Sequence, residues 1–315
     1  MGTAFDDGSW ALILGGSSGF GLATARKLAE QGMNLCIVHR DRRGQMRTIE
    51  PEFEKLRGLG VGFRSWNVDA TSNEKRQGVL DEIGSVMGEG GKVRVLLHSI
   101  AFGNLKLIAP EKPLPRSAPH ALAAKLGVDP EALIAASDEL LAEGEDGVHS
   151  LVTPPTYSST SYLDEDDFAR TILSMGTSLL GWTQGLFERD LFAPGARIFG
   201  LTSEGNEVAW KGYAAVSSAK VALEALARSI AVEYGPYGIR CNIIQAGITD
   251  TPALRAIPGN ELLVAQARLR NPGGRLTQPR DVANVIYLLS LDEAGWINGE
   301  LIRVDGGEHI SGVTR

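Results

Sequence analysis

Tyr213 and Lys220 are the two side chains of this sequence whose types and spacing fit one another best. The apolar pattern predicts a helix over residues 214–234. A separation of seven is about two helical turns, so we expect both side chains on one face. A phenol can donate a hydrogen bond to an oxygen that gains negative charge, and an ammonium group favours that charged state. Taken singly, Tyr213 could equally be a packing residue and Lys220 a solvated one.

A glycine cluster indicates a binding site for a dinucleotide. Residues 10–14 predict a strand and residues 22–31 a helix, with Gly15, Gly19 and Gly21 between them. In such a turn the first glycine permits the bend, the second lets the backbone approach a pyrophosphate, and the third lets helix and strand pack closely. The free N–H groups at the helix start favour phosphate. An ordinary glycine-rich turn is the alternative. The predicted contacts are Gly15, Ser17, Ser18, Gly19, Phe20 and Gly21.

Charged residues after the second predicted strand, 35–38, bear on the choice of cofactor. The strand is followed by His39, Arg40, Asp41 and two further arginines. An acidic side chain at the end of this strand would accept a hydrogen bond from the ribose 2′-hydroxyl of NADH. Arginines would instead bind the 2′-phosphate of NADPH. We predict NADPH, with NADH possible, bound through His39 and Arg40. Asp41 would oppose a phosphate unless it points away or pairs with an arginine, and a solvated charged loop is the alternative.

Asp69 and Ala70 follow the third predicted strand, 62–68. The carboxylate of Asp69 could accept a hydrogen bond from the adenine amino group. It could equally cap the next helix, because aspartate is a preferred N-cap residue. We predict that Asp69 and Ala70 contact the cofactor.

The elements that must position these residues alternate regularly along the chain. Apolar strands separated by helix-length stretches predict a parallel sheet with helices on both faces. We therefore expect an α/β fold, a single Rossmann-type doubly wound domain over residues 1–315, with Gly32 closing the first helix. The seven expected strands are 10–14, 35–38, 62–68, 93–99, 196–202, 239–245 and 301–304.

Residues 105–162 interrupt this alternation. They contain several prolines, an alanine-rich helical pattern over 121–141 and a serine- and threonine-rich stretch, but no strand. We predict a helical insertion within the domain. It follows the carboxyl end of the fourth strand, the edge at which ligands bind in such sheets.

Composition excludes several other classes of protein. The 315 residues are 43% hydrophobic and 22% charged, as in ordinary globular proteins, and the formal charge is −7. An acidic balance argues against nucleic-acid binding and against a polybasic membrane binder. No apolar run is long enough for a membrane span, and residues 1–9 do not predict a secretory signal. Cys36 and Cys241 are isolated, which predicts core thiols in a reducing, cytoplasmic compartment, and no metal-ligand spacing occurs.

Three stretches together resemble the short-chain dehydrogenase/reductase superfamily. The glycines at 15, 19 and 21 match its cofactor turn, residues 242–247 resemble its sixth strand, and residues 304–307 resemble its C-terminal signature. The resemblance covers nearly the whole chain apart from the insertion. Ordinary members carry Tyr-x3-Lys on the long helix, but here Val216 stands four residues before Lys220.

Tyr213 instead gives the spacing Tyr-x6-Lys, which is similar to that of the enoyl-acyl-carrier-protein reductase family. Residues 97–101 and 246–251 also resemble that family, as do residues 281–284, 299–300 and 304–307. The resemblance implies Tyr213, Lys220 and Ser203 as catalytic residues, although the superfamily serine could equally fall on Thr202. It implies that His98 lines the cofactor pocket through its backbone. The further cofactor contacts it implies are Ser99, Ile100, Ala101, Thr202, Lys220, Gly247, Ile248, Thr249 and Thr251.

The chain departs from the enoyl reductase pattern at three places. Its first turn is the ordinary superfamily turn, and Ser203 stands where a second tyrosine is frequent. The superfamily asparagine of the fourth helix falls on Met175 in an ungapped comparison. The resemblance implies a substrate lid over residues 251–274, and Trp210 and Met175 either wall an acyl pocket or belong to the core. The chain is therefore expected to be a divergent member.

The resemblance implies NADPH-dependent reduction of a 2-enoyl thioester, on acyl carrier protein or coenzyme A, in fatty-acid synthesis. Hydride would reach C3, and Tyr213 would stabilise the resulting enolate. A carbonyl-reducing dehydrogenase of the 3-oxoacyl or hydroxysteroid type is the alternative enzyme, and a non-catalytic nucleotide sensor is the alternative outside enzymes. The resemblance further implies a homotetramer with helices 178–191 and 213–234 at one interface. The insertion could cover the acyl entrance, contact a carrier protein or extend an interface.

Overall fold

A seven-stranded parallel sheet forms the centre of the protein. The computed structural model describes residues 4–112, 117–158 and 160–312. The strand order is β3-β2-β1-β4-β5-β6-β7, and each neighbouring pair is parallel. This confirms the predicted Rossmann-type α/β fold. The strands are β1 (Ser9–Leu14), β2 (Asn34–His39), β3 (Phe63–Asn67), β4 (Lys92–His98), β5 (Phe192–Ser203), β6 (Arg240–Ala246) and β7 (Leu301–Val304).

The chain reverses direction across the sheet between β1 and β4. It leaves β1 toward β2 and β3 on one side, then returns to β4 and continues outward to β7. Loops from the carboxyl ends of β1 and β4 therefore diverge and leave a crevice between them, which is the usual ligand site of such sheets.

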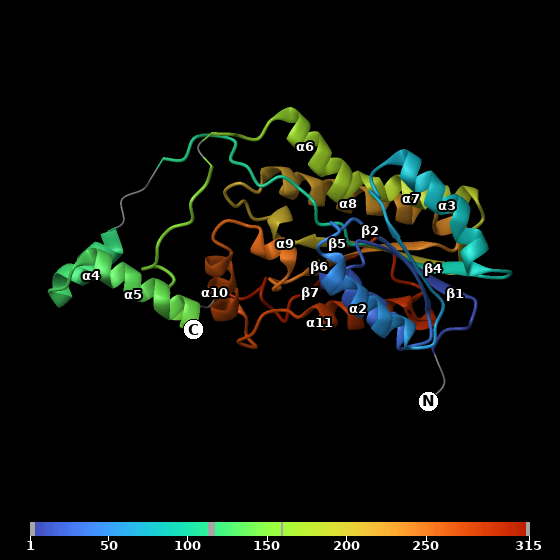
Figure 1. The fold of residues 1–315 in the computed structure, drawn as a ribbon, viewed down its shortest axis with the longest axis horizontal. Helices are drawn as coiled ribbons and strands as arrows, with labels where there is room; N and C mark the ends of the chain where they lie inside the picture. Colours follow the sequence, from blue (N-terminus) through green and yellow to red (C-terminus); the bar gives the residue numbers. More distant parts are fainter. Residues whose placement is uncertain (1–3, 113–116, 159, 313–315) are drawn as a thin grey trace.

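Helices cover both faces of the sheet (Figure 1). On one face α3 (Asn73–Met87), α7 (Ser178–Glu188) and α8 (Ala214–Glu233) supply apolar side chains to a single buried cluster. On the other face α1 (Gly19–Ala29), α2 (Met46–Arg57) and α11 (Pro279–Ser290) do the same. The central strands β1, β2 and β4 are almost wholly buried, which explains why they are continuous apolar runs rather than alternating ones.

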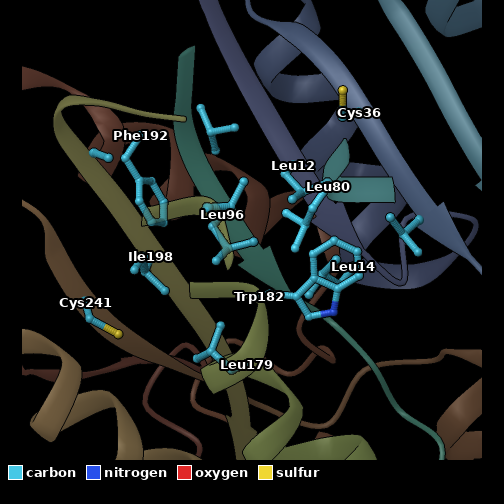
Figure 2. Close-up of a cluster of buried hydrophobic side chains, with 14 of the residues drawn as sticks. Leu12, Leu14, Cys36, Leu80, Leu96, Leu179, Trp182, Phe192, Ile198 and Cys241 are labelled. Atoms are coloured by element: carbon cyan, nitrogen blue, oxygen red, sulfur yellow. The ribbon is translucent and has the colours of Figure 1, made fainter. Parts of the chain in front are cut away.

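Trp182 of α7 connects this core to the cofactor side of the molecule. Its side chain is fully buried in the cluster that contains Leu14 and Leu80 (Figure 2). The indole Nε1 donates to the carbonyl of Ala70, just beyond β3, at 2.9 Å. Removal of such a side chain typically costs about 3–5 kcal/mol, so α7 and the loop after β3 are firmly held together.

Two predicted helix boundaries were wrong. The first helix begins at Gly19 rather than at residue 22, and its C-cap is Glu30. Gly32 lies beyond the cap with φ of 92°, a left-handed conformation that glycine adopts without strain, and its N–H donates to Ala29. The long helix spans Ala214–Glu233, so its predicted start was correct and its end was one residue too late, and Tyr213 is its N-cap residue.

The alanine-rich stretch of the insertion is two helices rather than one. These are α4 (Ser117–Leu126) and α5 (Pro130–Glu143), separated at Gly127, whose φ is 68°. Asp129 caps α5 by accepting from the Ala132 N–H. The pair extends away from the sheet (Figure 1). Residues 113–116 and 159 of the predicted insertion lie outside the described residues.

The segment after the insertion contains a widened helical turn. Helix α6 (Glu165–Ile172) continues into a π-helical turn at Leu173–Thr177 and then into α7.

After β6 the predicted lid forms α9 (Pro252–Arg255) and α10 (Asn260–Arg270). Arg268 of α10 donates to Asp146 at 3.2 Å, so α10 contacts residues 105–162. Short 3-10 turns occur at Asp146–Val148, Glu204–Asn206, Gly235–Tyr237 and Asp292–Ala294. No helix within the described ranges is long and apolar enough to cross a membrane.

Candidate active site

A cavity of about 570 Å³ lies at the carboxyl edge of the sheet. Its walls come from segments that follow β1, β2, β3, β4, β5 and β6, and from the start of α8. The structure thus brings together residues far apart in the sequence. The predicted site residues that line it are Gly15, Ser17, Ser18, Gly19, Phe20, His39, Arg40, Asp69, Ala70, Ser99, Ile100, Ala101, Thr202, Ser203, Tyr213, Lys220, Gly247, Ile248, Thr249 and Thr251.

Gly21 is absent from this lining because it serves packing. A Cβ at Gly21 would lie 2.2 Å from the carbonyl oxygen of Gly15, so only glycine allows α1 to approach β1 this closely. Gly15 itself has φ of 86°, and a Cβ there would lie 2.5 Å from the Ser99 carbonyl oxygen. These contacts agree with the packing role predicted for the third glycine and the bend predicted for the first.

The start of α1 presents unsatisfied backbone donors to the cavity. Ser18 is the N-cap residue, but its side chain makes no capping hydrogen bond. Gly19 borders the cavity, and a Cβ there would meet only Thr251 among the described residues, at 3.5 Å. Free N–H groups at a positive helix end, beside a backbone without side chains, form an anion site. A dinucleotide fits this turn, which would hold its pyrophosphate.

The residues after β2 and β3 form the other end of the cavity. His39 is buried, and its Nδ1 lies 2.8 Å from Asp41 Oδ2, so the Asp41 carboxylate is turned toward the imidazole. Arg40 donates to Asp69 Oδ2 at 2.7 Å and lies 4.3 Å over the ring of Phe102. Arg40 is therefore already positioned across the cavity, beside the place expected for an adenosine.

Asp69 does not cap the next helix. The N-cap of α3 is Ser72, whose side chain accepts from Lys75. Asp69 Oδ1 instead accepts from the backbone and the hydroxyl of Thr71, at 2.9 and 2.6 Å. Burial opposes ionisation, but the hydrogen bonds from Thr71 and Arg40 outweigh it and hold the pKa of Asp69 below its usual range.

Tyr213 faces the cavity from the start of α8. Its side chain is 8% exposed, and its ring packs edge-on against Trp210 at 5.4 Å. The phenol oxygen lies 3.5 Å from Ser203 Oγ. Burial raises the pKa of Tyr213, while the contact with Ser203 lowers it less strongly. The phenol is therefore a protonated donor near neutral pH, with the serine hydroxyl beside it.

Lys220 lies in α8, seven residues after Tyr213, and lines the same cavity. Its Nζ donates to the Leu201 carbonyl at 2.8 Å. Burial lowers its pKa from 10.5 to about 8, and the negative charge of Glu224 opposes that shift. Glu224 Oε1 also accepts from Thr202 at 2.5 Å and from Asn206 at 2.8 Å. The hydroxyl of Thr202 is thus engaged with Glu224, which leaves Ser203 as the serine near the phenol.

His98 lies outside the cavity lining. It is 1% exposed, and its Nε2 lies 2.8 Å from Ser178 Oγ. Burial and then the charge of Lys220 lower its pKa to about 3. A neutral, enclosed imidazole is a structural residue, and the backbone beyond it, from Ser99 to Ala101, forms the cavity wall instead.

One wall near Tyr213 is apolar. Met175 and Val216 are buried in a small cluster with Tyr213, and Leu105, Trp210 and Ile257 pack against it. Met175 belongs to the π-helical turn, where one extra residue shifts the side chains that face the cavity. Such a wall suits an acyl chain better than a polar substrate.

The sequence analysis missed some residues of the cavity. Glu204 and Glu308 line it, and both contact Arg270 of α10, while Phe102 lies under Arg40. Glu308 follows two glycines after β7, and an isolated acid there gives no sequence signal. Glu308 reaches the cavity because β7 pairs with β6, which places the segment after β7 beside the end of β6.

Comparisons with known proteins identify the family of this chain. Residues 9–112 match the family model described as short chain dehydrogenase, and residues 131–309 match that described as Enoyl-(Acyl carrier protein) reductase. The chain is 40% identical to cis-4-hydroxycyclohexanecarboxylate dehydrogenase of Sinomonas cyclohexanicum over 29% of its own length and 36% of the relative. It is 34% identical to the NADH-dependent enoyl-acyl-carrier-protein reductase of Escherichia coli K12 over 39% of its length and 47% of the relative. It thus spans less than half of each.

Solved structures extend the fold comparison to nearly the whole chain. The enoyl-acyl-carrier-protein reductase (NADH) of Aquifex aeolicus VF5 has a TM-score of 0.69 at 21% identity, covering 97% of this chain and 98% of that one. Fold and site together define a nucleotide-dependent oxidoreductase with a doubly wound sheet. The chain belongs to the short-chain dehydrogenase/reductase superfamily, whose members use NAD(H) or NADP(H).

Proposed function

We propose that this protein is an NADPH-dependent enoyl thioester reductase. The observation that carries the proposal is the position of Tyr213, seven residues before Lys220, while Val216 at the spacing of four is a buried apolar residue. A carbonyl reductase needs an acid close to the carbon that receives hydride. A phenol one turn earlier suits a more distant oxygen, such as the thioester oxygen of a 2-enoyl substrate.

Each residue of the site then has a defined task. Bound NADPH supplies the hydride. The Tyr213 phenol donates to the thioester oxygen as it gains charge, and Ser203 orients the phenol. The Lys220 ammonium, which lines the same cavity, would bind the ribose of the cofactor and would favour negative charge on the thioester oxygen. The apolar wall of Met175, Val216 and Trp210 excludes water and holds the acyl chain.

The preference for NADPH rests on Arg40. Its guanidinium lies beside the expected adenosine position, and Asp41 is turned toward His39 rather than toward the cavity. An arginine can form paired, charge-assisted hydrogen bonds with a 2′-phosphate. Arg40 would then exchange its contact with Asp69 for the phosphate.

The test follows NADPH absorbance with crotonyl and longer 2-enoyl thioesters of coenzyme A and acyl carrier protein, and with a 3-oxoacyl thioester. We expect oxidation with the enoyl substrates and a loss of about 100-fold or more in kcat for Tyr213→Phe, since one preorganised oxyanion donor contributes about that much. Tyr237→Phe is the matched control, because Tyr237 is 63% exposed. Activity with the 3-oxo substrate alone would refute the proposal.

A carbonyl-reducing dehydrogenase is the second candidate. It is favoured by the ordinary glycine turn at residues 15–21 and by the dehydrogenase named among the relatives. The same assay separates the two candidates, because this enzyme would consume NADPH with the 3-oxoacyl thioester and not with the enoyl substrates.

We further propose a homotetramer assembled through α7 and α8. Apolar side chains remain exposed along both helices, with Leu180 at 38%, Val221 at 47% and Val232 at 76% exposure. Burying such side chains between copies would remove apolar area from water. Light scattering after size-exclusion chromatography should give four times the chain mass, and a lower mass for Val221→Glu. A monomeric wild type would contradict this.

A further inference from the structure

A 3-10 turn at Glu204–Asn206 follows β5 directly and lies against the ring of Tyr213. The function proposed above gives this 204–206 turn no task. A Cβ added to Gly205 would lie 2.4 Å from Cε1 and 2.9 Å from Cδ1 of Tyr213. Cε1 adjoins the ring carbon that carries the phenol oxygen. The backbone of Gly205 therefore lies close to the ring edge beside the hydroxyl, and only a residue without a side chain allows that approach.

Hydrogen bonds hold both ends of the 204–206 turn. At its start, Arg270 in the last turn of α10 donates through Nη1 and Nη2 to Oε1 and Oε2 of Glu204, at 2.8 and 2.6 Å. At its end, Asn206 Nδ2 donates to Oε1 of Glu224 in α8 at 2.8 Å. The turn is therefore fixed to α10 on one side and to α8 on the other, with Gly205 between the two attachments.

The pair of Glu204 and Arg270 is largely removed from water. The Glu204 side chain is 11% exposed and that of Arg270 is 30% exposed. A paired arginine–carboxylate contact fixes the geometry of both side chains, and loss of one partner leaves a charge uncompensated. The other acidic contact of α10, from Arg268 to Asp146, is a single hydrogen bond at 3.2 Å from a more exposed arginine. Arg270 is therefore the arginine of α10 that is best placed to fix the turn.

We propose that the 204–206 turn is a positioning element for the Tyr213 phenol and that Arg270 holds this turn in place from α10. The inference rests on the proposed function, in which the phenol donates to the thioester oxygen. Ser203, immediately before the turn, lies 3.5 Å from the phenol oxygen, and Gly205 lies against the ring. A shift of about 1 Å in a reacting group can cost about 100-fold in rate. The residues of the turn act through the phenol and not on the substrate.

The test is a double-mutant cycle on kcat with crotonyl-coenzyme A, using Glu204→Gln, Tyr213→Phe and the double variant. Glu204→Gln keeps the shape of the side chain and removes its charge. Its kcat should fall about tenfold with KM nearly unchanged, because the phenol acts only in the transition state. In the Tyr213→Phe background the same substitution should cause no further fall, since the positioned group is absent. Isothermal titration calorimetry should give equal NADPH affinities for wild type and Glu204→Gln.

Gly205→Ala tests the contact with the ring independently. Its Cβ would lie about 1 Å inside the ordinary contact distance from Cε1, so kcat should fall about 100-fold. No further fall is expected in the Tyr213→Phe background. Asp146→Asn is the matched control for the charge pair, because it removes the acidic partner of Arg268, two residues before Arg270. It should leave kcat unchanged.

Five results would overturn the inference. These are an equal fall in kcat in both backgrounds, an unchanged kcat in Glu204→Gln, a higher KM without a lower kcat, weaker NADPH binding, and a fall in Asp146→Asn equal to that in Glu204→Gln. The proposed function fails in a different way, because wild type would then oxidise NADPH with the 3-oxoacyl thioester alone. The same cycle would be measured with that substrate. No oxidation with either substrate would overturn both.

Discussion

Replacing Lys220 with methionine should remove a rise in stability that the wild-type protein shows between pH 7.5 and pH 9.5. Burial lowers the pKa of this lysine from 10.5 to about 8 in the folded protein. Between these two values the unfolded chain binds a proton that the folded protein does not. The free energy of unfolding must therefore rise with pH in this range.

The size of the effect follows from the two pKa values. At pH 7.5 the lysine is mostly charged in both states and contributes little to the pH dependence. At pH 9.5 it is mostly neutral in the fold and mostly charged in the unfolded chain. The free energy of unfolding should rise by about 2 kcal/mol between these pH values through Lys220 alone. Methionine has a similar length and no charge, so the variant lacks this contribution.

The assay is urea denaturation of wild type and Lys220→Met at several pH values in this range. The difference between their free energies of unfolding should change by about 2 kcal/mol, because groups common to both proteins cancel. Lys211→Met is the control. In the wild-type protein the hydrogen bond to Glu111 raises the pKa of Lys211 above 10.5. The contribution of Lys211 to the free energy of unfolding is therefore lost only at a pH above this range. A constant difference between wild type and Lys220→Met would refute the reasoning.

Three further substitutions test the cofactor turn, the cofactor preference and the support beneath Lys220. Gly21→Ala places a Cβ 2.2 Å from the Gly15 carbonyl oxygen, so urea denaturation should show a loss of about 1–3 kcal/mol and calorimetry weaker NADPH binding. Arg40→Leu should lower the preference for NADPH over NADH about tenfold in dissociation constants, because a charge-assisted contact is lost. Thr202→Val removes a donor to the buried Glu224 carboxylate and should cost about 1–3 kcal/mol in urea denaturation.

Each of these has a matched control. Gly78→Ala lies in α3 with nothing within 4 Å of the new Cβ, so it should leave NADPH binding intact and stabilise the helix by up to about 1 kcal/mol. Arg42→Leu neutralises an exposed arginine near Arg40 that does not line the cavity. Thr183→Val removes a buried hydroxyl that donates to a carbonyl of its own helix. Equal effects in a variant and its control would contradict the role assigned to that residue.

Local sequence determined the strands and the cofactor turn of this protein. Short apolar runs bounded by glycine predicted all seven strands, and the glycine spacing after residue 14 predicted the turn, because both depend on neighbouring residues. The predicted helix ends were less accurate than the predicted strands. Gly19 begins α1 with φ of 52°, a left-handed conformation that glycine adopts without strain, and the apolar pattern of the helix does not mark this start.

Tertiary structure decided which residues share the cavity and what each side chain does there. Asp69 accepts hydrogen bonds from Thr71 and Arg40. The Thr202 hydroxyl donates to Glu224. His98 is buried outside the cavity lining. Glu308 reaches the cavity only because β7 pairs with β6. Burial, charge and hydrogen-bond partners come from segments distant in the chain. The spacing of residues along the sequence therefore predicted the chemistry of Tyr213 and Lys220, whereas the partners that tune them depended on the fold.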